Sequence, residues 1–401
     1  MPYLLFAGLF IWSLGSFTSI TIMSLYFLFV AIPAIYFLKN TNFRAWSKST
    51  WALVAFSFVL ILSVLVNREI MVEGFKPIAK VKYFLLFLLT IAPLAFYREK
   101  VFTKRNIKFL TYGLLLSATV AAISGMIAMN TGFNFLRQKE ASIDRNAGLF
   151  GMLMTYAHAG ALLQVLLTGL LIYRDEVKEL ISIKIVAAVW IINLLSLYLT
   201  YTRGAWIAFA VAIPFFFFLR KKKEFFVTIA GIAVIGTLVW FSVPKVRETF
   251  TERQVQSDDV RIGLWKAALK AFEERPILGM GFHNFEPLSV PIKEKYQIST
   301  DGIYGHAHNN YLEVLAVSGL LGIIAFTAWQ LLWLWECVKR NDLIARLCFP
   351  FIIAFMAGGL TQVTVFDGED IFFIMIVFSI FQIKNYLDNA AAAAIKGKVT
   401  V

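Results

Sequence analysis

The feature that most constrains this chain is the recurrence of long apolar stretches separated by short polar connections. A helix that crosses a lipid bilayer needs about 20 mostly apolar residues, because hydrocarbon offers backbone polar groups no partner and a helix satisfies its own. Apolar residues make up 59% of the 401 residues and charged residues only 16%, which excludes a set of soluble domains. We therefore predict an all-α integral membrane protein.

Twelve stretches are candidates for membrane-spanning helices. They cover residues 3–14, 18–38, 50–66, 81–96, 109–129, 149–173, 184–201, 205–219, 225–243, 311–335, 347–366 and 371–387. Four regions follow from this order: nine helices in residues 1–243, a long polar loop at 244–310, three helices in 311–387 and a tail at 388–401. The loop is too long to be a simple connection, so we expect it to fold.

The cations in the short connections predict the orientation in the membrane, because Lys and Arg accumulate on the side that is not translocated. With a cytoplasmic N-terminus, the inner connections contain Lys39, Arg44, Lys48, Arg98, Lys100, Lys104, Arg105, Lys108, Arg174, Lys178, Lys184, Arg220 to Lys223, Lys339, Arg340 and Arg346. Both termini then lie inside and the 244–310 loop lies outside. The net charge of +13 is explained in this way, and no nucleic-acid motif accompanies it, so we predict no nucleic-acid partner.

Within the loop, Ser257-Asp258-Asp259 has the composition of a helix start, with a hydroxyl cap followed by acidic residues. Val260, Leu264, Ala267, Ala268 and Ala271 then recur at helical spacing. We expect an amphipathic helix that ends near Arg275-Pro276 and rests its apolar face on the membrane domain.

The connections assigned to the outer face also contain cations, which the orientation rule disfavours there: Arg68, Lys76, Lys80, Lys82, Arg137, Lys139, Arg145 and Arg203. They are either solvated charges at the lipid headgroups or a funnel that binds an anion. Arg203 is the clearest candidate, since Thr202-Arg203-Gly204-Ala205-Trp206 leaves almost no loop to expose it. Its planar guanidinium suits phosphate, and Gly204 permits a close approach of backbone or ligand.

His306 and His308 precede the helix expected from about Asn310. In an extended backbone, residues two apart place both side chains on one face, which resembles half a metal site. His283, Glu286 and Asp301 are available as further ligands, but their spacing is unconvincing, so we predict no metal. A general base that removes a proton from a hydroxyl is the favoured interpretation, and simple capping of the following helix remains the alternative.

These residues resemble the motifs of one family. His308-Asn309, followed after nine residues by Gly319-Leu-Leu-Gly322, resembles the histidine motif of the O-antigen ligases. Thr202 to Trp206 resembles the arginine motif of that family. The segments 259–268, which contains Arg261, and 276–285 resemble the rest of its periplasmic loop. The O-antigen ligases belong with O-antigen polymerases and protein O-oligosaccharyltransferases to one superfamily of membrane glycosyltransferases.

The resemblance implies a GT-C-like fold and a periplasmic active site at the inner membrane of a Gram-negative bacterium. It implies transfer of a glycan from undecaprenyl-pyrophosphate to a lipid A-core hydroxyl, without a metal or other cofactor. Carried over, His308 is the base and Arg203 and Arg261 hold the pyrophosphate. With the outer-face cations and the histidine motif, the predicted donor-binding residues are Arg203, Arg261, Arg137, Arg145, Lys80, Lys82, His306 and Asn309. No carboxylate nucleophile is evident, so we expect inversion at the anomeric carbon.

Two alternatives remain open. A polymerase or protein O-oligosaccharyltransferase of the same superfamily shares the donor motifs, which say little about the acceptor. A transporter of lipid-linked glycans is a different class, and the absence of a visible inverted repeat in the sequence argues against it.

Overall fold

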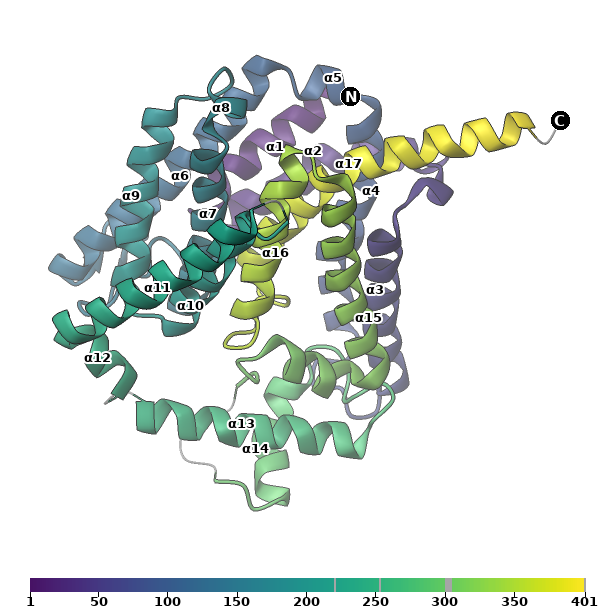
Figure 1. Cartoon of the computed structure of the whole chain (residues 1–401). Helices are drawn as coiled ribbons and strands as arrows, with labels where there is room; N and C mark the ends of the chain where they lie inside the picture. The colour runs from purple at the N-terminus through teal and green to yellow at the C-terminus, as the bar shows by residue number, and fades with distance from the viewer. Residues whose placement is uncertain (220, 252–253, 300–304, 400–401) are drawn as a thin grey trace.

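The computed structural model describes residues 1–219, 221–251, 254–299 and 305–399, and these are almost entirely helical (Figure 1). Arg220 from the inner connections and Asp301 from the histidine cluster lie outside the described residues. The strands among them are β1 (Phe133–Asn134) and β2 (Lys139–Glu140), which pair in an antiparallel hairpin.

Eight of the described helical segments are long and apolar enough to cross a membrane: α2 (Ile20–Leu38), α3 (Lys48–Val66), η2 with α4 (Lys76–Val81 and Lys82–Phe96), α6 (Lys104–Thr131), α7 (Leu153–Ile172), α11 (Lys222–Ser242), α15 (Asn310–Arg340) and α17 (Gly368–Val399). Four shorter apolar helices, of 10–17 residues, account for the remaining predicted stretches: α1 (Pro2–Gly15), α9 (Ile183–Leu199), α10 with η3 (Arg203–Ala212 and Ile213–Phe216) and α16 (Leu343–Gly358). The all-α membrane class is therefore confirmed, whereas a count of twelve crossings stays a prediction.

The polar loop folds into α12 (Pro244–Thr251), α13 (Gln254–Glu274) and α14 (Phe285–Lys295). These helices lie at the end of the bundle opposite both chain termini, α5 (Arg98–Val101) and α8 (Arg174–Val177) (Figure 1). The remaining short element is η1 (Phe43–Ala45). This arrangement agrees with the predicted grouping of the connections, while the side that faces the periplasm stays a prediction.

The predicted start of the loop helix is wrong. Ser257 to Asp259 lie inside α13, which already includes Gln254. Glutamine is a good helix former, so Gln254 and Gln256 favour continuing the helix toward the N-terminus over stopping it at the Ser257 hydroxyl. The end after Glu274 is as expected, before Arg275-Pro276. Leu264, Ala267, Ala268 and Ala271 are fully buried, whereas Val260 is only partly buried, so the apolar stripe is confirmed from Leu264 onward.

The predicted 311–335 helix is not continuous, because Gly319 in α15 has φ 62° and ψ −157°. The segment 276–281 docks against this break. The amide groups of Met280 and Gly281 donate to Ala316 O and Val317 O at 2.8 and 3.1 Å. In return, the amides of Leu320 and Leu321 donate to Pro276 O and Ile277 O. The helical hydrogen bonds that are lost at the break are thus replaced by hydrogen bonds to the 276–281 segment.

The two glycine-containing motifs of the sequence therefore touch each other. A Cβ on Gly279 would lie 2.5 Å from Ala316 O, and a Cβ on Gly319 would lie 2.5 Å from the carbonyl carbon of Ile277. The Asn67 side chain at the end of α3 donates to Gly279 O at 2.9 Å and accepts from Arg275 at 2.6 Å. The contact joins the loop to α3 and α15 together.

An aromatic cluster holds the helices on either side of the site. Trp329 and Trp333 of α15 are fully buried against Phe378 of α17, with ring centroids 5.7 and 4.8 Å apart. Phe355 of α16 packs edge-on against Trp329. This packing joins α15, α16 and α17, and the connection between α16 and α17 carries Thr361 and Gln362.

Candidate active site

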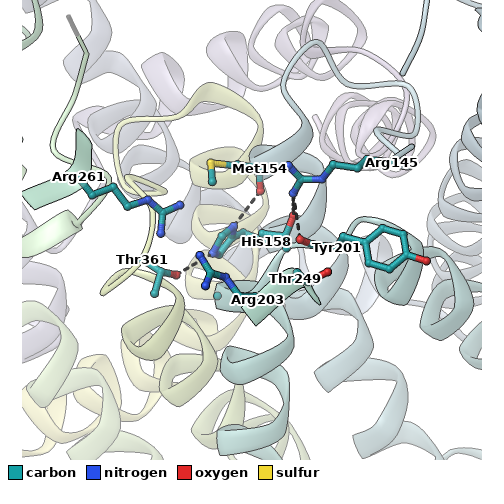
Figure 2. Close-up of a pocket in the computed structure, with 10 residues that line it drawn as sticks. Arg145, Met154, His158, Tyr201, Arg203, Thr249, Arg261 and Thr361 are labelled. Atoms are coloured by element: carbon teal, nitrogen blue, oxygen red, sulfur yellow. Dashed lines mark hydrogen bonds between the residues drawn. The ribbon is translucent and has the colours of Figure 1, made fainter. Parts of the chain in front are cut away.

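A cavity of about 270 Å³ opens where α7, α10 and α13 meet the α16–α17 connection (Figure 2). Most of the residues that line it have polar or charged side chains: Arg145, Met154, His158, Tyr201, Thr202, Arg203, Gly204, Thr249, Arg261 and Thr361. Figure 2 shows Arg203 and Arg261 reaching toward the same region as His158 and Thr361. The structure thus brings together Arg203 and Arg261, which are far apart in the sequence.

Arg203 is the first residue of α10, so a helix N-terminus opens into the cavity beside its side chain. Backbone amides and the helix dipole at such an end favour an anion. The guanidinium lies over the Phe250 ring, 5.7 Å from its centroid. A Cβ on Gly204 would lie 2.0 Å from Thr361 Oγ1. The predicted close approach at Gly204 is therefore made by the α16–α17 connection.

Arg145 supports the turn that precedes Arg203. Its Nε donates to Thr200 O at 2.8 Å, and a terminal nitrogen donates to Tyr201 O and to Thr202 Oγ1 at 3.2 and 3.0 Å. These carbonyls follow the end of α9, where helical partners run out and positive charge is stabilising. Tyr201 itself has φ 47°. Arg145 therefore both lines the cavity and positions Arg203.

Arg261 and Trp265 lie one turn apart on α13 and act on two parts of the site. Arg261 lines the cavity. The indole of Trp265 donates to Ala307 O at 2.8 Å, and the Ala307 amide donates to Glu313 Oε2 at 2.7 Å. Ala307 is fully buried, so the residue between the two histidines is held from both sides.

His306 and His308 are neighbours, with ring centroids 4.2 Å apart, but the backbone is not extended as predicted. His308 has φ 48°, a left-handed turn that any L-residue adopts at some cost, here balanced by the hydrogen bonds of the segment. His308 Nδ1 lies 2.8 Å from Gln362 Oε1. Within the described residues, the buried Nε2 of His306 makes no hydrogen bond.

The electrostatic surroundings keep His308 neutral. Burial lowers the pKa of His308 to about 4, and His306 and Arg261 act in the same direction. Burial likewise lowers the pKa of His306. At neutral pH the imidazole of His308 is therefore unprotonated, which is the form that accepts a proton.

Asn309 has a positioning role in the structure. Its Oδ1 accepts from the amides of Tyr311 and Leu312, which caps α15, and its Nδ2 donates to Leu360 O at 3.1 Å. Asn310 completes the attachment, since its side chain bonds Thr364 through both polar atoms. The helix is therefore capped by Asn309, and the alternative that the histidines cap it is wrong.

Three other predicted cations do not line this cavity. Arg137 donates to Phe150 O, and Lys82 lies over the Tyr83 ring at 5.4 Å. Lys80 donates to His283 Nδ1 at 3.4 Å, where burial and this lysine lower the pKa of His283 to about 3. Contact of Arg137, Lys80 or Lys82 with the lipid-linked glycan donor stays a prediction. In this conformation such a contact requires a ligand that extends beyond the cavity.

Sequence reasoning missed His158, Thr361 and Gln362. His158 is buried in α7, where its Nδ1 lies 2.8 Å from Met154 O and its Nε2 lies 3.4 Å from Thr361 Oγ1. A histidine inside an apolar stretch was a usable signal. No comparable signal in the sequence indicated Thr361 and Gln362. Among the described residues, no group of three or more His, Cys, Asp or Glu is arranged to hold a metal ion; metal independence stays a prediction.

The fold and this cavity define a multi-pass helical membrane protein with a cationic site at one end of the bundle. Residues 186–327 match the model of a protein family described as O-antigen ligase. This match supports the relation to the O-antigen ligase family that the motifs predicted, and the members of that family are glycosyltransferase-like enzymes. Arg203, Arg261 and His308 all fall within the matched region, whereas Arg145, His158 and Gln362 fall outside it.

An "Uncharacterized protein" of Haemophilus influenzae is similar to this chain over 317 residues, with 24% identity. The similarity covers 74% of this chain and 74% of that protein. The similar region therefore extends well beyond the segment that matches the family.

Proposed function

We propose that this protein is an O-antigen ligase that transfers a glycan from undecaprenyl-pyrophosphate to a lipid A-core hydroxyl at the periplasmic face of the inner membrane. One observation carries the proposal. Arg203 and Arg261, from two separate family motifs, line one cavity. His308, from a third motif, does not line it, but its imidazole contacts Gln362, the residue that follows the cavity-lining Thr361.

For this reaction the protein mainly has to position the donor and the acceptor and stabilise the negative charge on the leaving pyrophosphate. The acceptor oxygen attacks the anomeric carbon, the bond from that carbon to the pyrophosphate oxygen breaks, and the pyrophosphate leaves with the electron pair. The acceptor proton passes to Nε2 of His308. Arg203, Arg261 and the N-terminus of α10 stabilise the charge that grows on the pyrophosphate, as preorganised donors do in other transfer reactions. Direct displacement inverts the anomeric centre.

The histidines supply the first test. Purified protein with a lipid-linked donor and a lipid A-core acceptor should lose about 10²- to 10⁴-fold in rate in His308→Ala, because the general base is gone. Donor affinity should stay near the wild-type value, since a neutral imidazole adds little to pyrophosphate binding. His306→Ala is the matched control and should be much milder. Equal activity of His308→Ala and wild type, or a larger loss in His306→Ala, would show that His308 is not the base.

The acceptor is tested in the same assay. Transfer to lipid A-core, with no chain growth on a glycan acceptor and no product on a pilin-like protein, supports the ligase. Product on only one of the other two acceptors identifies a polymerase or a protein O-oligosaccharyltransferase. Movement of the donor across vesicles without any transfer would overturn glycosyl transfer altogether.

A further inference from the structure

We propose that Gln362 is the positioning residue of the general base: its amide oxygen accepts the Nδ1 proton of His308, which directs the unprotonated Nε2 toward the acceptor hydroxyl. This inference rests on the proposed role of His308. A neutral imidazole exists as two tautomers, and only the one with the proton on Nδ1 has its lone pair on Nε2. The partner of Nδ1 therefore decides which nitrogen is the base.

The contact is short and shielded from water. His308 Nδ1 and Gln362 Oε1 are 2.8 Å apart, and Gln362 is only 1% exposed. If this bond broke, the buried amide oxygen would find no water as a replacement partner, so breaking the bond is energetically unfavourable. With the amide turned over, its NH₂ would donate to Nδ1 and place the proton on Nε2, where it would abolish base function.

The connection that carries Gln362 is attached on two sides, so its amide is held at a defined place. From the histidine side, the Oδ1 of Asn310 accepts from the amides of Thr364 and Val365 at 2.8 and 3.1 Å. From α7, Thr155 Oγ1 donates to Asp367 Oδ2 at 2.7 Å. A Cβ on Gly359 would lie 2.4 Å from Asn310 Nδ2, which shows how closely the two segments approach.

An uncharged orienting residue suits this base. The titratable groups that face His308 are His306 beside it, Arg261 from α13, His158 from α7 and Glu286 from α14. The hydrogen bond with Gln362 and the charge of Glu286 raise the pKa of His308, but burial, His306 and Arg261 outweigh them. A carboxylate at position 362 would add a strong partner for imidazolium and raise the pKa of His308 further. The neutral amide also orients the ring, but it favours the protonated form less than a carboxylate would.

Two substitutions separate orientation from charge. Gln362→Leu removes the acceptor in a similar volume, and we expect kcat to fall by about 10²-fold or more with the KM for the lipid-linked donor changed by less than about twofold. Gln362→Glu keeps an acceptor, so it should regain most of the activity at alkaline pH. Its acidic limb should move to higher pH by about 1–3 pH units, because the carboxylate stabilises imidazolium.

The control is Gln382→Leu, which removes another buried amide, one that donates to Ser49 and Glu336 outside the cavity. It should leave kcat and the pH profile unchanged. Since the shape of the pH profile does not depend on the fraction of folded enzyme, Gln362→Glu stays informative even with a low yield.

An unshifted acidic limb in Gln362→Glu, or wild-type kcat in Gln362→Leu, overturns the role of Gln362. If His308→Ala is inactive while both Gln362 variants behave as wild type, only this inference fails. Full activity in His308→Ala instead removes the proposed base itself, whatever the Gln362 variants do.

Discussion

The arginines that line the cavity differ in what their side chains contact. Arg145 uses three hydrogen bonds to hold the end of α9, so its contribution to any ligand is partly structural. Arg203 and Arg261 extend into the cavity from different helices. We therefore expect their guanidinium groups, and not merely positive charge, to determine how tightly the pyrophosphate binds.

Replacing the arginines tests this at the residue level. Arg203→Lys keeps the charge but loses the planar fork, and we expect donor affinity to fall about 10- to 100-fold, as lost hydrogen bonds to a charged group predict. Arg261→Ala should weaken both donor binding and turnover. Arg98→Lys, at an exposed arginine in the connection beyond α4, is the control. Wild-type donor affinity in both cavity variants, measured by titration of the purified protein, would exclude a pyrophosphate clamp.

At the scale of elements, the break in α15 and the segment 276–281 that docks against it connect the loop to the membrane helices. We call this contact the joint. The positive φ of Gly319 and the 2.5 Å approach of Ile277 leave no room for a side chain. This joint places α13 relative to α15, and α13 in turn carries Arg261 toward the cavity and Trp265 toward Ala307. Activity should therefore depend on a glycine that touches no substrate.

Gly319→Ala is expected to destabilise the protein by about 1–3 kcal/mol, because alanine is strained at this φ and its Cβ displaces the docked backbone. A lower thermal unfolding midpoint in detergent, together with slower transfer, is the expected outcome. Gly236→Ala is the matched control, since a Cβ at that position in α11 has no heavy atom within 4 Å. The same unfolding midpoint for both variants would contradict the role of the joint.

At the scale of the whole molecule, the orientation in the membrane follows from the cations of the short connections. Single cysteines in Glu274→Cys and Glu294→Cys should react with an impermeant thiol reagent in intact spheroplasts, whereas Lys222→Cys should react only after lysis. The natural Cys337 and Cys348 are buried and should give little background. Reaction of Lys222→Cys from outside would invert the topology and place the cavity on the cytoplasmic side.

The positions of the helices could be predicted from the sequence alone, because lipid imposes a rule on each segment separately. Every predicted stretch corresponds to an apolar helix, although local patterns misplaced the start of α13 and did not show the break at Gly319. A break of that kind is stable only when another segment supplies the missing hydrogen bonds. That segment, residues 276–281, lies about 40 positions earlier in the chain.

The candidate site, too, could be predicted from the sequence only in part. The motif residues Arg203, Arg261 and His308 could be chosen from the sequence because their types and spacing resemble a family with that chemistry. The convergence of Arg203 and Arg261 on one cavity, the support of Arg203 by Arg145 and the contact of His308 with Gln362 were decided by tertiary structure. Lys80, Lys82 and Arg137 looked equivalent to Arg145 as cations in outer connections, yet only packing determines which of them reaches the cavity. Charge and spacing are local properties, whereas a binding site is defined by distances between residues that the chain keeps far apart.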